Sequence, residues 1–306
     1  MAFEVWGDSK VESEWFRDLE PRLARCRIYS IGDRATNPKH IEELILYDRP
    51  DIILCRDGEP ILVLEKTREV PTGHNIGQRL GRIVRALECK TPAVTLLPFR
   101  ARKHGLHTGI CEINVRVLRA AARMGELHSL PCLFLGWPVD SHGELIGDGS
   151  KSPGLKSLVA HSLDQGLELC AAPVVSALKQ MESHAHSLEA ARAQYTKPPA
   201  SVEIQAAPVA VGTAGHRRVC VYTIEMTPAS CRREDPYTGM QFLYDYLYCR
   251  NGTDVVDKKT ALVLRFPRLT KKQFMDANPN DPRRKSSLWY ATANELWFSD
   301  GKIMLR

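Results

Sequence analysis

The pattern of apolar and polar residues predicts an α/β core between residues 38 and 99. Residues 38–48, PKHIEELILYD, place Ile41, Leu44 and Ile45 at helical spacing behind a proline, which is typical of a helix start. Two apolar runs follow, DIILC and ILVLE, and an Asp-Gly pair between such runs favours a β-hairpin. Because both runs are apolar on successive residues, we expect the two strands to be covered on both faces.

The same alternation of helices and strands extends on both sides of this hairpin. Residues 76–88 carry apolar positions on one helical stripe, and residues 93–99, AVTLLPF, are typical of a buried strand. Residues 111–125 and 155–194 favour helices, with a strand at LPCLFLGWP between them. The predicted fold class is α/β, with a mixed central sheet that contains an antiparallel hairpin and is flanked by helices.

A change in composition predicts a division of the chain. Residues 197–216, KPPASVEIQAAPVAVGTAGH, contain three prolines and many small residues, which indicates a linker. Beyond it, RVCVYTIEM and ALVLRF are strand-like, and the last segment is rich in aromatic residues. We therefore expect a core with helical elaboration over residues 1–196 and a C-terminal α+β region over residues 217–306.

Composition excludes several classes of protein. The 306 residues are 43% hydrophobic and 25% charged, which is ordinary for a globular protein and not for a disordered one. No apolar run approaches the roughly 18 residues of a membrane span, and the acidic N-terminus lacks an export-signal pattern. Nine scattered cysteines without a paired framework favour a reducing compartment, so we expect a cytoplasmic protein without membrane contact.

The distribution of charge is more informative than its total. The net charge is +6, and residues 66–103 hold nine Lys or Arg against two acids. A second basic stretch covers residues 265–285. Clusters of this kind suggest a polyanionic partner, and a solvated basic surface is the alternative interpretation.

Two carboxylates are expected to meet at one end of the hairpin. Asp51 precedes the first strand, and the antiparallel return brings Glu65 back beside it. Carboxylate oxygens suit Mg²⁺, which uses one or two protein carboxylates together with waters and phosphate oxygens. The alternative is a turn cap at Asp51 and a surface acid at Glu65.

These features resemble the PD-(D/E)XK nuclease superfamily, and PTGHNIGQR is similar to the Gly-Asn loop of some type II restriction endonucleases. The resemblance covers residues 38–99 and implies a restriction-endonuclease-like core of a helix, a three-stranded antiparallel meander, a helix and a fourth strand. We find no separate first meander strand between the predicted helix and Asp51. The resemblance implies that Asp51 and Glu65 bind Mg²⁺, that Lys66 is catalytic, and that Glu43 or Glu42 assists. It also implies DNA-backbone contacts from the loop and helix that follow, at Gly73, His74, Asn75, Gln78, Arg79 and Arg82.

The order Glu65-Lys66-Thr67 departs from the family motif, in which glutamate and lysine occupy alternate positions. Alternate residues of a strand share a face, so in a regular strand Thr67 lies with Glu65 and Lys66 points away. We expect a β-bulge that turns Lys66 inward. Otherwise Arg68, Arg79 or Arg82 would supply the catalytic cation.

Other candidate sites fit the patterns less well. Glu88-Cys89-Lys90 spells the family motif literally, but it ends a predicted helix instead of lying on the return strand. His104, His107 and Cys111 have no fourth metal ligand at matching spacing and favour a loop role. The C-terminal aromatic residues are expected in a core more than on a base-stacking surface (Trp289, Tyr290, Trp297 and Phe298).

The leading hypothesis from the sequence is a Mg²⁺-dependent, site-specific, double-stranded DNA endonuclease of the type II restriction class, acting as a homodimer. The absence of fused helicase or methylase motifs favours a stand-alone enzyme. A repair, recombination or phage-processing nuclease on the same core is the second hypothesis. A non-catalytic DNA-binding protein with a decayed core is the third.

Overall fold

The chain forms two compact units in the computed structural model, residues 1–75 with 82–196, and residues 76–81 with 197–306. The structure describes the following residues: 2–32, 37–46, 48–70, 74–104, 108–113, 115–191, 202–206, 218–223, 228, 260–276 and 293–305. Among them, no helix is long and apolar enough to cross a lipid bilayer.

The first unit is built on a six-stranded mixed sheet with the strand order β2-β1-β3-β4-β5-β8. The α/β class with a mixed central sheet is therefore confirmed. β3 and β4 are antiparallel, whereas β4, β5 and β8 are mutually parallel. The strands are β1 (Phe3–Gly7), β2 (Arg27–Ser30), β3 (Ile52–Arg56), β4 (Glu59–Lys66), β5 (Ala93–Leu97) and β8 (Cys132–Gly136).

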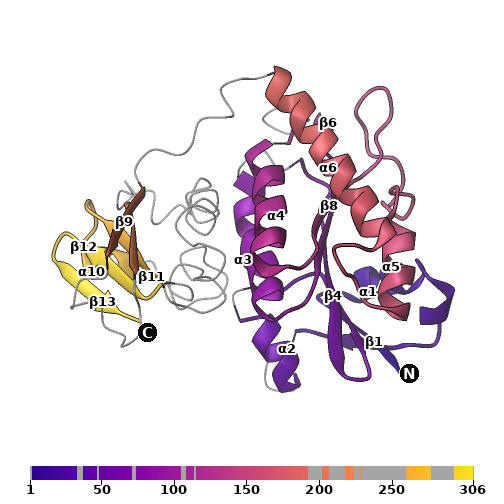
Figure 1. The fold of residues 1–306 in the computed structure, drawn as a ribbon, viewed down its shortest axis with the longest axis horizontal. Helices are drawn as coiled ribbons and strands as arrows, with labels where there is room; N and C mark the ends of the chain where they lie inside the picture. Colours follow the sequence, from indigo (N-terminus) through magenta and orange to yellow (C-terminus); the bar gives the residue numbers. More distant parts are fainter. Residues whose placement is uncertain are drawn as a thin grey trace. The chain divides into compact units, whose positions relative to one another are not determined.

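Helices lie on both sides of this sheet (Figure 1). They are α1 (Lys10–Arg17), α2 (Lys39–Leu44), α3 (His74–Glu88), α4 (Val115–His128), α5 (Leu155–Asp164) and α6 (Ala172–Ala191), with a 3-10 turn at Pro21–Leu23. A short hairpin, β6 (Arg100–Lys103) and β7 (Gly109–Glu112), follows β5. α1 begins where it does because the Ser9 hydroxyl accepts the Glu12 backbone N–H at 3.2 Å, which satisfies an otherwise unpaired donor.

The predicted β-hairpin is confirmed, with a two-residue turn at Asp57 and Gly58. Their φ values are 51° and 84°, so both residues lie in the left-handed region that a type I′ turn requires. One extra residue enters β4 just beyond the turn. Cys55 pairs with Pro60 but Leu54 pairs with Leu62, a β-bulge next to a proline that cannot donate to the ladder.

Besides β4, the neighbour of β3 in the sheet is the N-terminal strand β1, which is antiparallel to β3. Between α2 and Asp51, where the resemblance leads one to expect the first meander strand, the described residues form no strand. β1 instead precedes α1, and β2 joins the sheet on the outer side of β1. β1, β3 and β4 are adjacent and antiparallel, as in a meander. However, α1, β2 and α2 lie between β1 and β3 along the chain, whereas a meander joins its strands directly.

The second unit contains a five-stranded sheet with the order β13-β12-β11-β10-β9. Its strands are β9 (Val202–Ala206), β10 (Arg218–Thr223), β11 (Thr260–Phe266), β12 (Glu295–Phe298) and β13 (Gly301–Met304), with helix α10 at Lys271–Met275. The expected linker over residues 197–216 is wrong in part, because it contains β9. The alternation in VEIQA forms a strand once β10 supplies an antiparallel partner.

Candidate active site

Asp51 and Glu65 are brought together at one edge of the six-stranded sheet. Ile52 pairs with Leu64 in the hairpin, so the residue before β3 and the residue after Leu64 lie opposite each other. The bulge in β4 sets this register, because without the extra residue Asp51 would lie opposite Leu64. Both acids are buried, with Glu65 1% and Asp51 9% exposed.

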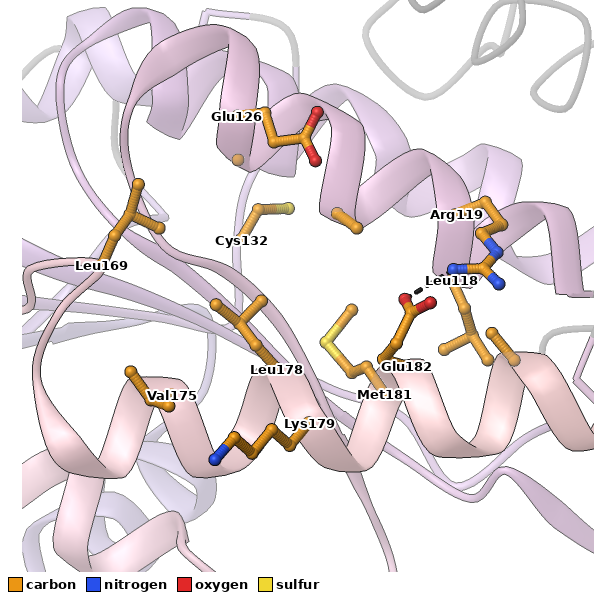
Figure 2. Close-up of a pocket in the computed structure, with 13 residues that line it drawn as sticks. Leu118, Arg119, Glu126, Cys132, Leu169, Val175, Leu178, Lys179, Met181 and Glu182 are labelled. Carbon is orange, nitrogen blue, oxygen red and sulfur yellow. Dashed lines mark hydrogen bonds and ion pairs between the residues drawn. The ribbon is translucent and has the colours of Figure 1, made fainter.

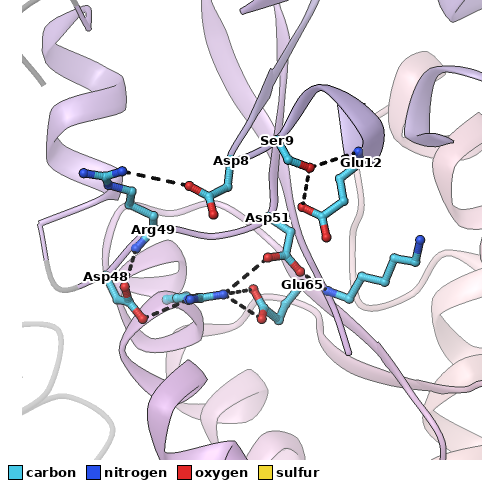
Figure 3. Close-up of polar contacts among 9 residues, drawn as sticks. Asp8, Ser9, Glu12, Asp48, Arg49, Asp51 and Glu65 are labelled. Carbon is cyan, nitrogen blue, oxygen red and sulfur yellow. Dashed lines mark hydrogen bonds and ion pairs between the residues drawn. The ribbon is translucent and has the colours of Figure 1, made fainter. Parts of the chain in front are cut away.

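The guanidinium of Arg82, on α3, bridges these carboxylates. Figure 3 shows the carboxylates of Asp48, Asp51 and Glu65 turned toward one another at this site. The Nη1 atom of Arg82 lies 2.7 Å from both Glu65 oxygens and 3.4 Å from Asp51 Oδ1. Its Nε donates to Asp48 Oδ2 at 2.9 Å. One cation therefore faces three carboxylates, and the pKa of Arg82 is raised despite burial because Glu65 and Asp48 favour its charged form.

The carboxyl group of Asp51 has a pKa raised to about 7. Burial is the largest cause, and the negative charge of Glu65 adds to it. The Lys66 backbone N–H, which donates to Asp51 Oδ2 at 2.7 Å, and the charge of Arg82 act in the opposite direction. When Asp51, Glu65 and Asp48 are all ionised, Arg82 neutralises only part of their charge, and an additional positive charge would favour the ionised form of Asp51.

Replacing Asp51 by asparagine is expected to stabilise the protein at neutral and alkaline pH. Between pH 4 and 7 the folded wild type binds more protons at Asp51 than the unfolded chain, so its stability falls as pH rises. Asparagine removes this loss, and the gain should reach roughly 4 kcal/mol at pH 8 and become small near pH 4. Urea unfolding of both proteins across this pH range measures the difference, and a pH-independent difference would contradict the raised pKa.

Lys66 does not turn toward the carboxylate pair, so the expected inward bulge is wrong. β4 pairs regularly with β5 through Glu65–Thr95 and Lys66–Leu96, and the bulge lies at the opposite end of the strand. The Lys66 ammonium instead stands 3.9 Å from the centre of the Trp15 ring, on the α1 side of the sheet. Burial lowers the pKa of Lys66 in this position.

Glu43 and Glu42 are not part of this site, in contrast to our expectation. Glu43 pairs with Lys39 at 3.9 Å on the exposed side of α2, and Glu42 accepts from Asn37 at 2.8 Å. The third acid is Asp48, which the sequence analysis missed. α2 ends at Leu44, earlier than predicted, so Asp48 lies in the segment leading to Asp51, and its position three residues before Asp51 was the signal that could have found it.

The expected DNA-contacting residues divide into three groups. Gly73 lies outside the described residues, and His74, Asn75 and Gln78 lie in α3 with side chains that the structure does not describe. Arg79 is half-exposed on the same helix. Arg82 is turned inward to the carboxylates, with only 19% of its side chain exposed, so its predicted role as a backbone contact is not supported by this arrangement.

The competing candidates are explained by local structure. Glu88 ends α3 and pairs with Arg85 at 3.3 Å, while Lys90 has a φ of 61° in the turn that follows. The literal motif therefore marks the end of a helix. His104 pairs with Glu144 at 2.9 Å, and His107 lies outside the described residues.

A separate cavity of about 420 Å³ lies between α4 and α6 (Figure 2). Its walls are mainly apolar, with Leu118, Leu178 and Met181 among them. On its rim Arg119 contacts Glu182 and binds Glu189 at 2.7 Å, while Glu126 and Lys179 also line it. The cavity therefore lacks the buried acids that distinguish the sheet edge.

Comparison with protein-family models, with curated proteins and with solved structures gave no match to this chain. The functional interpretation rests on the residues and their geometry. Among the described residues, no group of three or more His, Cys, Asp or Glu side chains forms a ready metal cage. The carboxylates of Asp51 and Glu65 provide two oxygen ligands, which fits Mg²⁺ because this ion usually takes only one or two carboxylates from the protein. Both carboxylates already contact one cationic nitrogen, Arg82 Nη1.

Proposed function

We propose that this protein is a Mg²⁺-dependent DNA endonuclease, most simply a type II restriction enzyme acting as a homodimer. The observation that carries the proposal is the meeting of Asp51 and Glu65, two buried carboxylates from adjacent antiparallel strands, around one positive charge. A structural role alone rarely places two acids in a buried position beside an apolar hairpin, because burying like charges is costly.

The sheet supports a restriction-endonuclease-like core. Strands β1, β3, β4 and β5 are successive neighbours in the sheet. The pairs β1–β3 and β3–β4 are antiparallel, and the pair β4–β5 is parallel. The family core uses the same succession, with the acids on the second and third of these strands and a helix, here α3, before the fourth. The N-terminal origin of β1 is the departure from that plan.

In the proposed mechanism Asp51 and Glu65 would hold the metal ion. Bound Mg²⁺ would neutralise charge on the phosphate and lower the pKa of an attacking water. Arg82 keeps the two carboxylates converged and would supply positive charge to the reacting phosphate. It replaces Lys66 as the cation of the site, because the Lys66 ammonium lies against Trp15.

A basic cavity at the same edge of the sheet supports a phosphate-bearing substrate. β5 is parallel to β4, so both strands end at the edge where Asp51 and Glu65 lie. The cavity measures about 200 Å³, and its lining includes Arg68 and Lys103, which form no ion pair with a described residue. Cationic side chains beside a metal site fit the backbone of a nucleic acid.

The double variant Arg68→Gln with Lys103→Gln is expected to weaken binding to all duplex sequences alike. Each lost phosphate contact should reduce the slope of log K against log salt by about 0.9. Fluorescence anisotropy with labelled duplexes in Ca²⁺ at several salt concentrations measures both quantities. Lys90→Asn is the matched control, because Lys90 is exposed at the opposite edge and its left-handed backbone tolerates asparagine.

The direct test is incubation of the purified protein with phage DNA and Mg²⁺. Discrete fragments are expected for a site-specific endonuclease, whereas a smear would favour a repair or processing nuclease. Fragment ends then report the position of cleavage on each strand. Intact DNA at all Mg²⁺ and Mn²⁺ concentrations would reject the enzyme.

A non-catalytic DNA-binding protein is the second candidate, and a specific observation favours it. Arg82 already occupies the place between Asp51 and Glu65, and Lys66 is displaced from the pair. A decayed nuclease core would have this arrangement, with an internal cation in place of the metal. Metal-independent DNA binding without cleavage would identify it.

A further inference from the structure

A row of three side chains crosses the sheet of the second unit. Arg265 of β11 pairs in register with Trp297 of β12, and Trp297 pairs with Lys302 of β13. Residues directly opposite each other in neighbouring strands project from the same face of a sheet. An indole therefore lies between two cations on one face.

This face is hollowed and accessible among the described residues. All three side chains line a cavity of about 600 Å³. Arg265 and Lys302 are exposed and Trp297 is half-exposed. Arg265 makes no ion pair with any residue that the structure describes, so its charge is available to a ligand.

The opposite face of the same sheet provides the core of this unit. Phe266 and Phe298 stack with ring centres 5.5 Å apart, and both pack against Phe274 of α10 at 5.4 and 5.2 Å. The sequence analysis expected Trp297 and Phe298 together in a core. The structure separates them, because successive residues of β12 point to opposite faces.

The indole is hydrogen-bonded to a neighbour on the same face of β12. Trp297 Nε1 donates to Glu295 Oε2 at 2.7 Å, and the Lys302 ammonium lies 3.5 Å from the same oxygen. Glu295 is fully buried, and the same carboxylate oxygen contacts both side chains, which restrains the edge of the indole. A ring held in one orientation loses little entropy when a flat ligand stacks on it.

We infer that this face binds a single-stranded segment of nucleic acid, with an unpaired base on Trp297 and phosphates at Arg265 and Lys302. Aromatic surfaces flanked by cations suit this ligand, because every base has a stacking face and every nucleotide carries a negative charge. Arg265 forms no ion pair with a described residue, and Lys302 lies on the other side of the indole while sharing Glu295 with it, so the row suits a ligand that carries both phosphates and a flat base. This binding is separate from the proposed cleavage and needs no metal.

The test uses the full-length protein in EDTA with a fluorescent oligothymidylate of about ten nucleotides. The competitor has the same number of phosphates but carries no bases. Wild type should bind the thymidylate about tenfold more tightly than the abasic strand. Trp297→Leu should lose that preference while keeping the salt dependence, and Trp297→Phe, which retains a stacking ring but not the Glu295 bond, should keep most of it.

Charge variants complete the test. Arg265→Gln should weaken binding of both strands equally and reduce the salt slope by about 0.7. Lys272→Gln, exposed on α10 on the other side of the sheet, is the control and should change neither. Equal affinity of wild type for the two strands, or unchanged thymidylate binding in both Trp297→Leu and Arg265→Gln, overturns the inference. Because EDTA prevents cleavage, failure of the proposed nuclease activity would not alter this result.

Discussion

Replacing Glu65 by glutamine is expected to abolish Mg²⁺-dependent DNA cleavage, with a loss of roughly a thousandfold or more. The amide keeps the size of the side chain but removes the negative charge that, with Asp51, would hold the metal. Glu65 is 1% exposed and both of its oxygens lie 2.7 Å from Arg82 Nη1, so its carboxylate is central to the site. Plasmid cleavage under single-turnover conditions measures the loss.

The matched control for this variant is Glu59→Gln. Glu59 lies on the same strand, at the hairpin end, and is exposed. It should cleave like the wild type. DNA binding by Glu65→Gln should persist or tighten, because one negative charge facing the phosphate is removed. If Glu65→Gln cleaves near the wild-type rate, the metal site lies elsewhere in the chain.

Replacing Arg82 by glutamine is expected to destabilise the protein strongly, by about 3–5 kcal/mol. The variant leaves Glu65 and Asp51 buried beside each other without the cation that bridges them. For a unit of this size the loss corresponds to a fall in melting temperature of roughly 10 °C. Thermal unfolding in EDTA measures it.

The double variant Glu65→Gln with Arg82→Gln is the control for this prediction. It removes the cation together with one of its carboxylates, so it should be more stable than Arg82→Gln alone. A double variant as unstable as the single one would show that Arg82 acts through packing and not through its charge.

Mg²⁺ separates the two candidate functions in the same experiment. If the carboxylates form a metal site, millimolar Mg²⁺ should raise the melting temperature of Arg82→Gln more than that of wild type, since the ion then replaces the lost positive charge. The double variant should not respond. Absence of any Mg²⁺ effect on Arg82→Gln would favour the non-catalytic DNA-binding protein, in which Arg82 permanently neutralises the pair.

Much of the hairpin was predictable because its signals are local. Asp57-Gly58 favours the left-handed conformations of a tight turn, and the flanking apolar runs have the length of strands. A short turn forces the chain back on itself, so Asp51 and Glu65 had to return to one edge of the sheet. The helix at residues 74–88 and the strand at 93–97 followed from apolar periodicity in the same way.

The detailed site was not predictable from these signals. A single extra residue beside Pro60 decides that Glu65 and not Leu64 lies opposite Asp51, and we expected the bulge at the other end of the strand. Lys66 points to Trp15, and that contact requires α1 to pack on the opposite face from α3. Asp48 and Arg82 are 34 residues apart, and only the packing of α3 on the sheet brings them together.

The sequence by itself determined the turn, the buried strands, the amphipathic helix and the presence of two acids at one end of a hairpin, because each depends on residues near one another in the chain. The tertiary structure decided that β1 is the neighbour of β3, that Arg82 is the cation between Asp51 and Glu65, and that Trp297 faces away from the phenylalanine core. Pairing between distant segments is chosen by burial and charge over the whole fold, and no local pattern encodes it.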